Sequence, residues 1–271
     1  MVNGEKVKRR AVPVFYLLAF GFSWLGWVPQ ALHARGLFPF DNPFFSLLGG
    51  GGPTLAAVAV LLWMKEKEKI RALFADLFKL RASAGWFVFA FAFWLAVGGL
   101  ALMGVALTGG TLTSSFQFAW FSLPAVFLGM LISNVWEEIG WRGFALPRLQ
   151  EKYADWQIAV LMGILWYAWH LPLILNPDTP MAALPWYGQA LFSISQTVIY
   201  TWLYRNTGGS LFFVSVFHAM SNTSAFVLLQ FGVFVSSYGF VVGITTLFAV
   251  LILLVYGGRQ FQRPIRASTA R

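Results

Sequence analysis

The chain has 271 residues, of which 58% are hydrophobic and only 11% charged, and its formal net charge is +9. A globular protein has about 25% charged residues, so this composition argues against a water-soluble fold. The absence of Cys excludes disulfides, thiol nucleophiles and thiolate metal sites. A bilayer removes the need for a charged surface, because lipid is the solvent of the outer face.

Eight apolar stretches are long enough to cross a bilayer, which takes about 20 mostly apolar residues. The first follows a basic segment, as in a signal peptide, but its apolar run is longer than usual there, so we interpret it as an uncleaved helix. We find no repeat and no second domain, and predict one all-α membrane domain over 1–271, a polytopic helical bundle. The predicted spans are 11–31, 44–64, 86–107, 118–142, 157–175, 186–204, 210–230 and 234–256.

The positions of the basic residues support this topology. With the N-terminus inside, the predicted cytoplasmic segments hold 18 of the 19 Lys and Arg residues, and only Arg35 lies outside. Cytoplasmic loops carry such an excess of positive charge, and a wrong number of spans would scramble the alternation. We therefore predict an integral cell-membrane protein with both termini in the cytoplasm. The net charge is a topology signal, so we expect contacts with membrane lipids and no nucleic acid.

A charged linker, residues 65–81, joins the second and third predicted spans. Apolar side chains recur between its charges at helical spacing, which suits an amphipathic helix on the cytoplasmic surface. A plain helical connector fits the same pattern equally well.

Four titratable residues lie inside or near apolar spans: Glu137, Glu138, His170 and His218. An ionisable side chain in a bilayer costs at least a few kcal/mol, so these residues are candidates for function. Glu138 precedes Arg142 by four residues, the favourable arrangement for a helical ion pair. We predict that Glu138 and Arg142 form a structural clamp and that Glu137 is the free carboxylate.

Two further residues share helix faces with the histidines. Asn222 follows His218 by four residues, and Trp166 precedes His170 by four. At a rise of about 1.5 Å per residue, Glu137, His170 and His218 lie roughly 12–20 Å from the cytoplasmic ends of their spans. We therefore predict one site near mid-membrane that contains Glu137, His170, His218 and Asn222.

This set of side chains predicts hydrolysis. A carboxylate shielded from water can act as a general base on a bound water, and a neighbouring His can orient that water or move the proton. A second His and an Asn amide can donate hydrogen bonds to an oxyanion. Two His and one Glu are also a ligand set for catalytic zinc, so Glu137, His170 and His218 would be the metal ligands of a Zn²⁺-dependent enzyme. The HExxH signature of many metalloproteases is absent.

At these residues the chain resembles the CPBP family of intramembrane proteases. That family comprises CAAX proteases and bacteriocin-processing enzymes and includes the type II CAAX prenyl endopeptidases. Its motifs EExxxR, FxxxH and HxxxN correspond to EEIGWR at 137–142, WYAWH at 166–170 and HAMSN at 218–222. The resemblance covers about residues 120–225, the predicted catalytic core. One departure is Trp166, which stands where the family has Phe.

The resemblance implies an intramembrane endopeptidase for a membrane-tethered protein or peptide, such as a prenylated CAAX tail. It implies that Glu137 activates water together with His170, and that His218 and Asn222 form the oxyanion site. Zinc-dependent and metal-free glutamate mechanisms are both open. Supporting roles fall to Glu138, Arg142 and Trp166, and we expect the larger Trp ring to pack as Phe does and to reshape the pocket.

Two other functions fit the same sequence. The first is a non-catalytic scaffold or immunity protein of the same fold, against which stands the presence of all motif residues. The second is a small proton-coupled transporter that uses the buried Glu and His residues as a relay. Transporters often contain internal repeats, and this sequence shows none.

Overall fold

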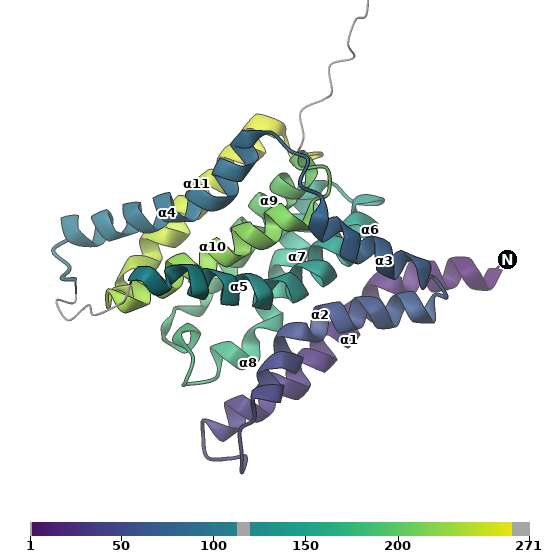
Figure 1. Ribbon diagram of the computed structural model, residues 1–271, viewed down its shortest axis with the longest axis horizontal. Helices are drawn as coiled ribbons and strands as arrows, with labels where there is room; N and C mark the ends of the chain where they lie inside the picture. The colour runs from purple at the N-terminus through teal and green to yellow at the C-terminus, as the bar shows by residue number, and fades with distance from the viewer. Residues whose placement is uncertain (1, 113–119, 262–271) are drawn as a thin grey trace, which may run out of the picture.

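A computed structural model describes residues 2–112 and 120–261 of the chain. The described residues form helices and turns and no β-strand (Figure 1), which confirms the predicted all-α class. The start of the predicted span 118–142 and most of the C-terminal segment lie outside the described residues. The α-helices are α1 (Val2–His33), α2 (Pro43–Trp63), α3 (Glu68–Ala75), α4 (Ala84–Leu107), α5 (Leu123–Glu138), α6 (Leu146–Gln150), α7 (Asp155–Trp169), α8 (Leu171–Ile174), α9 (Trp186–Asn206), α10 (Leu211–Gln230) and α11 (Phe234–Tyr256).

The described helices include five that are long and apolar enough to cross a membrane: α1 from Arg10 onward, α2, α4, α10 and α11. Large apolar side chains are exposed along them, for example Leu17, Leu107 and Leu254. Such a surface suits lipid, and the chain is a polytopic membrane bundle. The predicted number of eight spans is not confirmed, because α5 and α7 have only 16 and 15 residues. A third predicted span, α9, has 21 residues but is too polar to be identified as a membrane span by composition.

Both short helices end beside predicted site residues. After Glu138, α5 gives way to a π-helical turn, η3 (Ile139–Ala145), which carries Arg142. Wider turns of this kind inside α-helices frequently mark functional sites. The break after α7 falls at His170, because Pro172 has no N–H to continue the helical hydrogen bonds and restricts the residue before it. The run from α5 through η3 to α6 therefore stays helical with a change of hydrogen-bond type, whereas α7 stops at Trp169 and a separate short helix, α8, follows His170.

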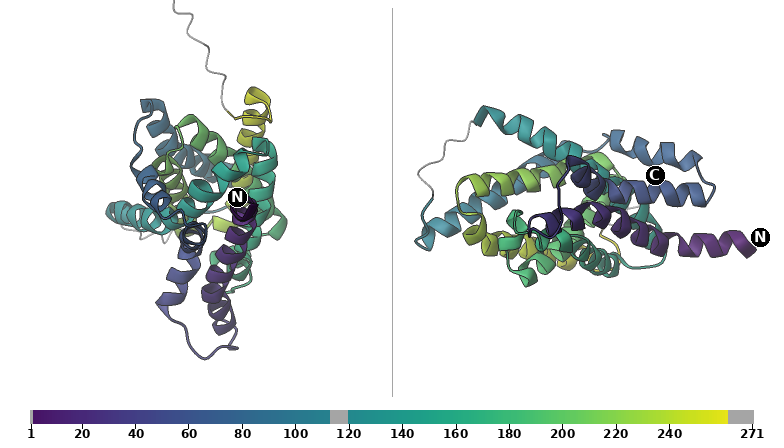
Figure 2. Two further views of the ribbon diagram at one scale, coloured as in Figure 1. Left: turned by 90° about the vertical axis from the view of Figure 1, so that its right-hand side faces the viewer. Right: turned by 90° about the horizontal axis from the view of Figure 1, so that it is seen from below.

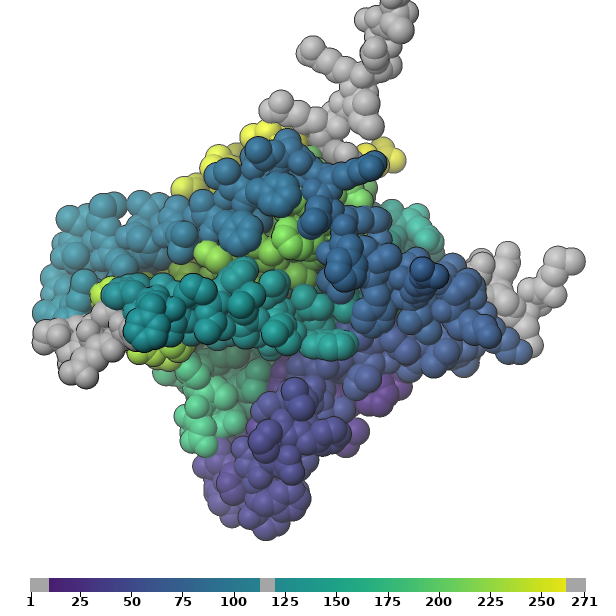
Figure 3. All heavy atoms as spheres, viewed as in Figure 1, coloured from purple at the N-terminus to yellow at the C-terminus, as the bar shows by residue number. Residues whose placement is uncertain are grey.

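The helices are arranged around a central group. In Figure 1, α4 and α11 lie along one side of the molecule, and α5, α7, α9 and α10 occupy its middle. The pair α1 and α2 runs side by side in all three ribbon views and projects from the rest (Figures 1 and 2). The space-filling view shows the same pair as a protruding part of the surface (Figure 3). The most enclosed of the long helices is α10, which carries two of the predicted site residues.

The turn between α9 and α10 is fixed by local sequence. Gly208 and Gly209 have φ of 65° and 78°, a backbone region that favours glycine, and they end α9. Ser210 then caps α10, because its Oγ accepts a hydrogen bond from the Phe213 N–H at 3.4 Å. The same hydroxyl donates to the Lys79 carbonyl at 2.6 Å, which ties this turn to the 65–81 linker.

The linker itself is helical over α3 and the short 3₁₀ turn η1 (Asp76–Phe78). Leu73 is buried against the bundle, whereas Phe78 and Leu80 are exposed. The helical prediction for this segment is therefore confirmed in part, and its place on the cytoplasmic surface stays a prediction.

The close contact between α1 and α2 depends on glycines at several positions, among them Gly49. A Cβ atom on Gly49 would lie less than 3 Å from the Trp27 indole, whereas one on Gly51 would meet nothing within 4 Å. We expect Gly49→Ala to lower the free energy of unfolding by about 1–3 kcal/mol through overpacking. Gly51→Ala is the matched control and is expected to be neutral or to stabilise, because Ala favours a helix by about 1 kcal/mol over Gly. Unfolding in detergent measures both, and equal losses would contradict this account of the contact.

Candidate active site

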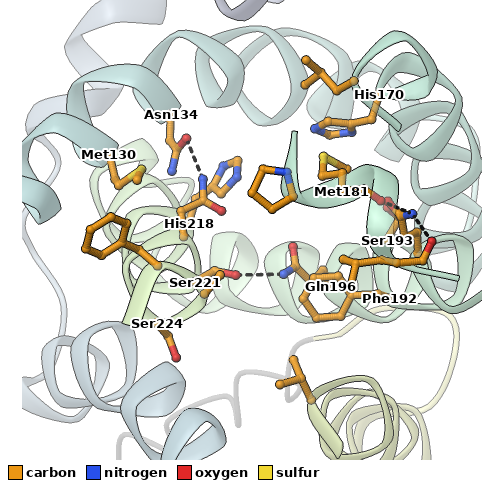
Figure 4. A pocket seen from close by; sticks show the side chains of 18 of the residues that line it. Met130, Asn134, His170, Met181, Phe192, Ser193, Gln196, His218, Ser221 and Ser224 are labelled. Atoms are coloured by element: carbon orange, nitrogen blue, oxygen red, sulfur yellow. Dashed lines mark hydrogen bonds between the residues drawn. The ribbon is translucent and has the colours of Figure 1, made fainter. Parts of the chain in front are cut away.

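A cavity of about 530 Å³ lies among the central helices, and all four predicted site residues line it. Glu137 comes from the last turn of α5, His170 from the end of α7, and His218 and Asn222 from α10. Figure 4 shows His170 and His218 within the same ring of lining side chains. Glu137 is 8% exposed, so it is nearly enclosed but reaches the cavity.

Glu138 lies behind this wall and is fully buried. Its Oε1 accepts hydrogen bonds from the Arg142 guanidinium at 3.1 Å and from His218 Nδ1 at 2.8 Å. The Arg142 guanidinium also lies over the rings of Tyr200 and Trp166, 4.1 and 5.0 Å from their centroids. The predicted Glu138–Arg142 ion pair is therefore present. The sequence reasoning missed the link to His218 and the contact with Tyr200.

Glu137 is bound differently from Glu138. Its Oε2 accepts a hydrogen bond from the Trp166 indole N–H at 3.4 Å. A Phe at this position, as in the family motif, has no such donor. Trp166 therefore packs against His170 and His218 as an aromatic residue, with ring centroids 5.3 and 5.5 Å away, and in addition holds the carboxylate.

The orientation of His170 is defined by a backbone carbonyl. Its Nδ1 lies 2.7 Å from the Trp166 oxygen. Because a carbonyl oxygen only accepts, Nδ1 carries the hydrogen and Nε2 of the neutral ring is an acceptor. The rings of Trp169 and Trp27 pack against His170, and the Trp24 indole donates to the Trp169 carbonyl at 3.0 Å, so α1 helps to fix this corner of the site.

Two hydrogen bonds connect α5 to α10 like rungs between antiparallel helices. One joins Glu138 to His218, and the other runs from Asn222 Nδ2 to Asn134 Oδ1 at 3.1 Å. The partners are four residues apart on each helix, so both rungs lie on the same face. Asn134 is 2% exposed and also lines the cavity (Figure 4). The sequence reasoning missed Asn134, although a polar residue one turn before Glu138 in an apolar stretch was a usable signal.

The described side chains do not present a ready ligand set for zinc. Among residues 2–112 and 120–261, no three His, Cys, Asp or Glu side chains are grouped closely enough to hold a metal ion. Glu137, His170 and His218 line one cavity, and the Nδ1 hydrogen bonds of the two histidines leave each Nε2 as the atom that could bind a metal. The three side chains do not form a ready-made zinc site among the described residues, and metal dependence stays a prediction.

Fold and site together define a class: a helical membrane protein whose central cavity presents a carboxylate, two imidazoles and an amide. Residues 118–224 match the family model described as type II CAAX prenyl endopeptidase, Rce1-like. This match confirms the resemblance predicted from the three motifs.

A curated relative supports the same resemblance. The chain is 31% identical over 116 residues to the CAAX prenyl protease 2 of Methanococcus maripaludis. The aligned region covers 41% of this chain and 42% of that relative, so the chain matches about two fifths of the relative's length.

Proposed function

We propose that this chain is an intramembrane endopeptidase that hydrolyses a peptide bond of a membrane-associated protein or peptide. The observation that carries the proposal is that Glu137, His170, His218 and Asn222 line one cavity. Glu138 and Arg142 lie outside the cavity wall and support it. The similarity to a relative named as a protease supports peptidase activity.

The first step is activation of water. The Glu137 carboxylate accepts a proton from a water in the cavity, and the acceptor nitrogen of His170 orients that water. The water oxygen attacks the carbonyl carbon of the scissile bond. The proton then passes to the amide nitrogen of the leaving segment, which departs as an amine. No step requires a metal ion.

The second requirement is stabilisation of the oxyanion that forms on the attacked carbonyl. Asn222 has two amide hydrogens, one of which is used toward Asn134, and the other is available to the oxyanion. When both ring nitrogens of His218 carry protons, Nδ1 donates to Glu138 and Nε2 can donate to the oxyanion. Preorganised donors of this kind contribute about 2.7–4 kcal/mol each to catalysis.

Asn134 provides a test of this site, because it accepts a hydrogen bond from Asn222 and is not one of the residues of the three motifs. We expect Asn134→Leu, which removes the acceptor at similar volume, to lower kcat by about 3- to 10-fold, the equivalent of one neutral hydrogen bond. If Asn134 acts through Asn222, adding the change to Asn222→Ala costs nothing further. Steady-state kinetics of the single and double variants decide this. Independent, multiplying losses would contradict the proposed role.

The substrate proposed is a membrane-tethered peptide, with a prenylated CAAX tail as the first candidate. Away from the four predicted site residues, the cavity is also lined by apolar side chains, among them Leu184 just after the η4 turn (Pro180–Ala183), Phe192 of α9 and Val241 of α11. Such a surface suits a lipid-modified or apolar peptide.

The proposal is tested by incubating purified protein in detergent with matched prenylated and unmodified peptides, with and without a zinc chelator. We expect internal cleavage, faster for the prenylated peptide, at a rate that the chelator leaves unchanged within about twofold. Loss of activity with the chelator, restored by Zn²⁺, would replace the metal-free mechanism. Intact peptides in every lane would contradict the proposal and favour a non-catalytic membrane protein of this fold.

A further inference from the structure

One face of α9 is polar although the helix lies in the middle of the bundle. Gln189, Ser193 and Gln196 follow one another at helical spacing and all line the cavity. Tyr200, one turn further, contacts the His218 ring, with centroids 5.7 Å apart. We call Gln189, Ser193 and Gln196 the α9 stripe. It contributes to the polarity that keeps α9 from being identified as a span, and polar side chains within membrane helices usually serve function.

Gln196 has one end of its amide fixed and the other unused. Its Nε2 donates to Ser221 Oγ at 3.1 Å, and Ser221 lies on α10 between His218 and Asn222. Among the described residues none donates a hydrogen bond to Gln196 Oε1. Figure 4 shows this oxygen directed away from Ser221, toward the middle of the labelled ring of side chains. The stripe therefore places an oriented acceptor beside the proposed oxyanion site.

Gln189 defines the other end of the stripe. Its Nε2 donates to the carbonyls of Met181 and Leu184 at 3.0 and 3.1 Å, which holds the η4 turn against α9. Seven residues separate Gln189 from Gln196, a rise of about 10.5 Å along a helix. An extended peptide covers about the same distance with three residues.

A hydrogen-bond acceptor in an apolar cavity selects a ligand with a donor, because an unpaired buried polar group costs about 1–3 kcal/mol. An isoprenoid or acyl chain has no donor. The main chain of an extended peptide has one N–H per residue and fits both the length and the chemistry of the stripe.

We infer that the α9 stripe is the binding track for the extended main chain of the substrate, with Gln196 Oε1 accepting one substrate N–H next to the scissile bond. The inference rests on the proposed function and names the part of the ligand that this wall of the cavity recognises. It predicts that binding depends on one particular main-chain amide hydrogen and tolerates changes in the side chain of that residue.

The test measures binding rather than turnover, with a fluorescent unmodified peptide and its mono-N-methylated series on protein carrying Glu137→Gln. N-methylation removes one N–H at a time. We expect one position near the scissile bond to weaken binding about 3- to 10-fold, the loss of one hydrogen bond. Adding Gln196→Met, which lacks the acceptor at similar length, is expected to reduce that dependence to less than about twofold.

Two further variants serve as controls. Ser195→Ala removes an α9 hydrogen bond to Thr246 on α11 (3.0 Å) that lies outside the cavity lining, so it is expected to keep the full N-methyl dependence. Ser221→Ala removes the group that orients Gln196 and is expected to weaken binding; it replaces Gln196→Met if that variant does not fold.

The outcomes separate this inference from the proposed function. Cleavage by the wild type together with unchanged N-methyl dependence in the Gln196→Met protein would overturn the track alone. Binding that depends on Gln196, without cleavage by the wild type, would overturn the proposed function and support the track. An unmodified peptide that binds neither protein, while the wild type cleaves the prenylated peptide, would overturn the track and leave the proposed function standing.

Discussion

Replacing Glu137 with Gln is expected to lower kcat for peptide cleavage by about 10³-fold, with little change in KM. The amide keeps the size and shape of the carboxylate but cannot accept a proton from water, and a general base contributes about 10²–10⁴-fold to a reaction rate. The Trp166 indole cannot compensate, since it only donates. Initial rates in detergent, with product identified by mass, measure the loss.

The matched control for this change is Glu151→Gln. Glu151 is exposed at the end of α6 and does not line the cavity of the site. It carries the same charge and should leave kcat unchanged. If Glu137→Gln kept more than about a tenth of the wild-type rate, far more than loss of a general base leaves, the proposed role of Glu137 would be wrong.

Arg142→Met is expected to destabilise the protein by about 3–5 kcal/mol, because removing one partner of a buried ion pair leaves the other charge uncompensated. Glu138 has no exposed surface, and its Oε2 has no hydrogen-bond partner among the described residues. The remaining bond from His218 would have to hold the carboxylate alone. Chemical unfolding in detergent measures the change.

A second variant separates charge from packing in this prediction. Glu138→Gln combined with Arg142→Met removes both charges of this pair, so the double variant is expected to regain part of the stability that Arg142→Met loses. Activity should stay low, because Glu138 also holds Nδ1 of His218. A double variant less stable than either single one would contradict the ion-pair account.

The long apolar helices were predictable from composition alone. Membrane helices are recognised by length and hydropathy, which a sequence shows directly. This is why the stretches that form α1, α2, α4, α10 and α11 could be predicted. The local sequence pattern does not show where packing between helices decides the backbone conformation. The π-helical turn η3 is accompanied by close approach of α2, since a Cβ on Gly140 would overlap Pro53, and no local pattern specifies such a contact.

The site was predictable where its residues share a helix turn. Glu138 and Arg142 pair at a spacing of four, and the motifs name His170, His218 and Asn222. Contacts between helices were not predictable from spacing. The second rung between Asn134 and Asn222, the Trp166 bond to Glu137, and the Gln196 bond to Ser221 each need the packed bundle, because their partners are far apart in the chain.

The measurement that tests the central claim most directly is cleavage of a membrane-tethered peptide by the wild-type protein reconstituted in liposomes, followed by mass spectrometry. We predict two fragments whose masses add up to the substrate plus one water, formed by the wild type and the Glu151→Gln control but not by the Glu137→Gln protein. An intact peptide accompanied by peptide-driven proton uptake would contradict it and would identify the buried carboxylate and imidazoles as a proton relay of a transporter.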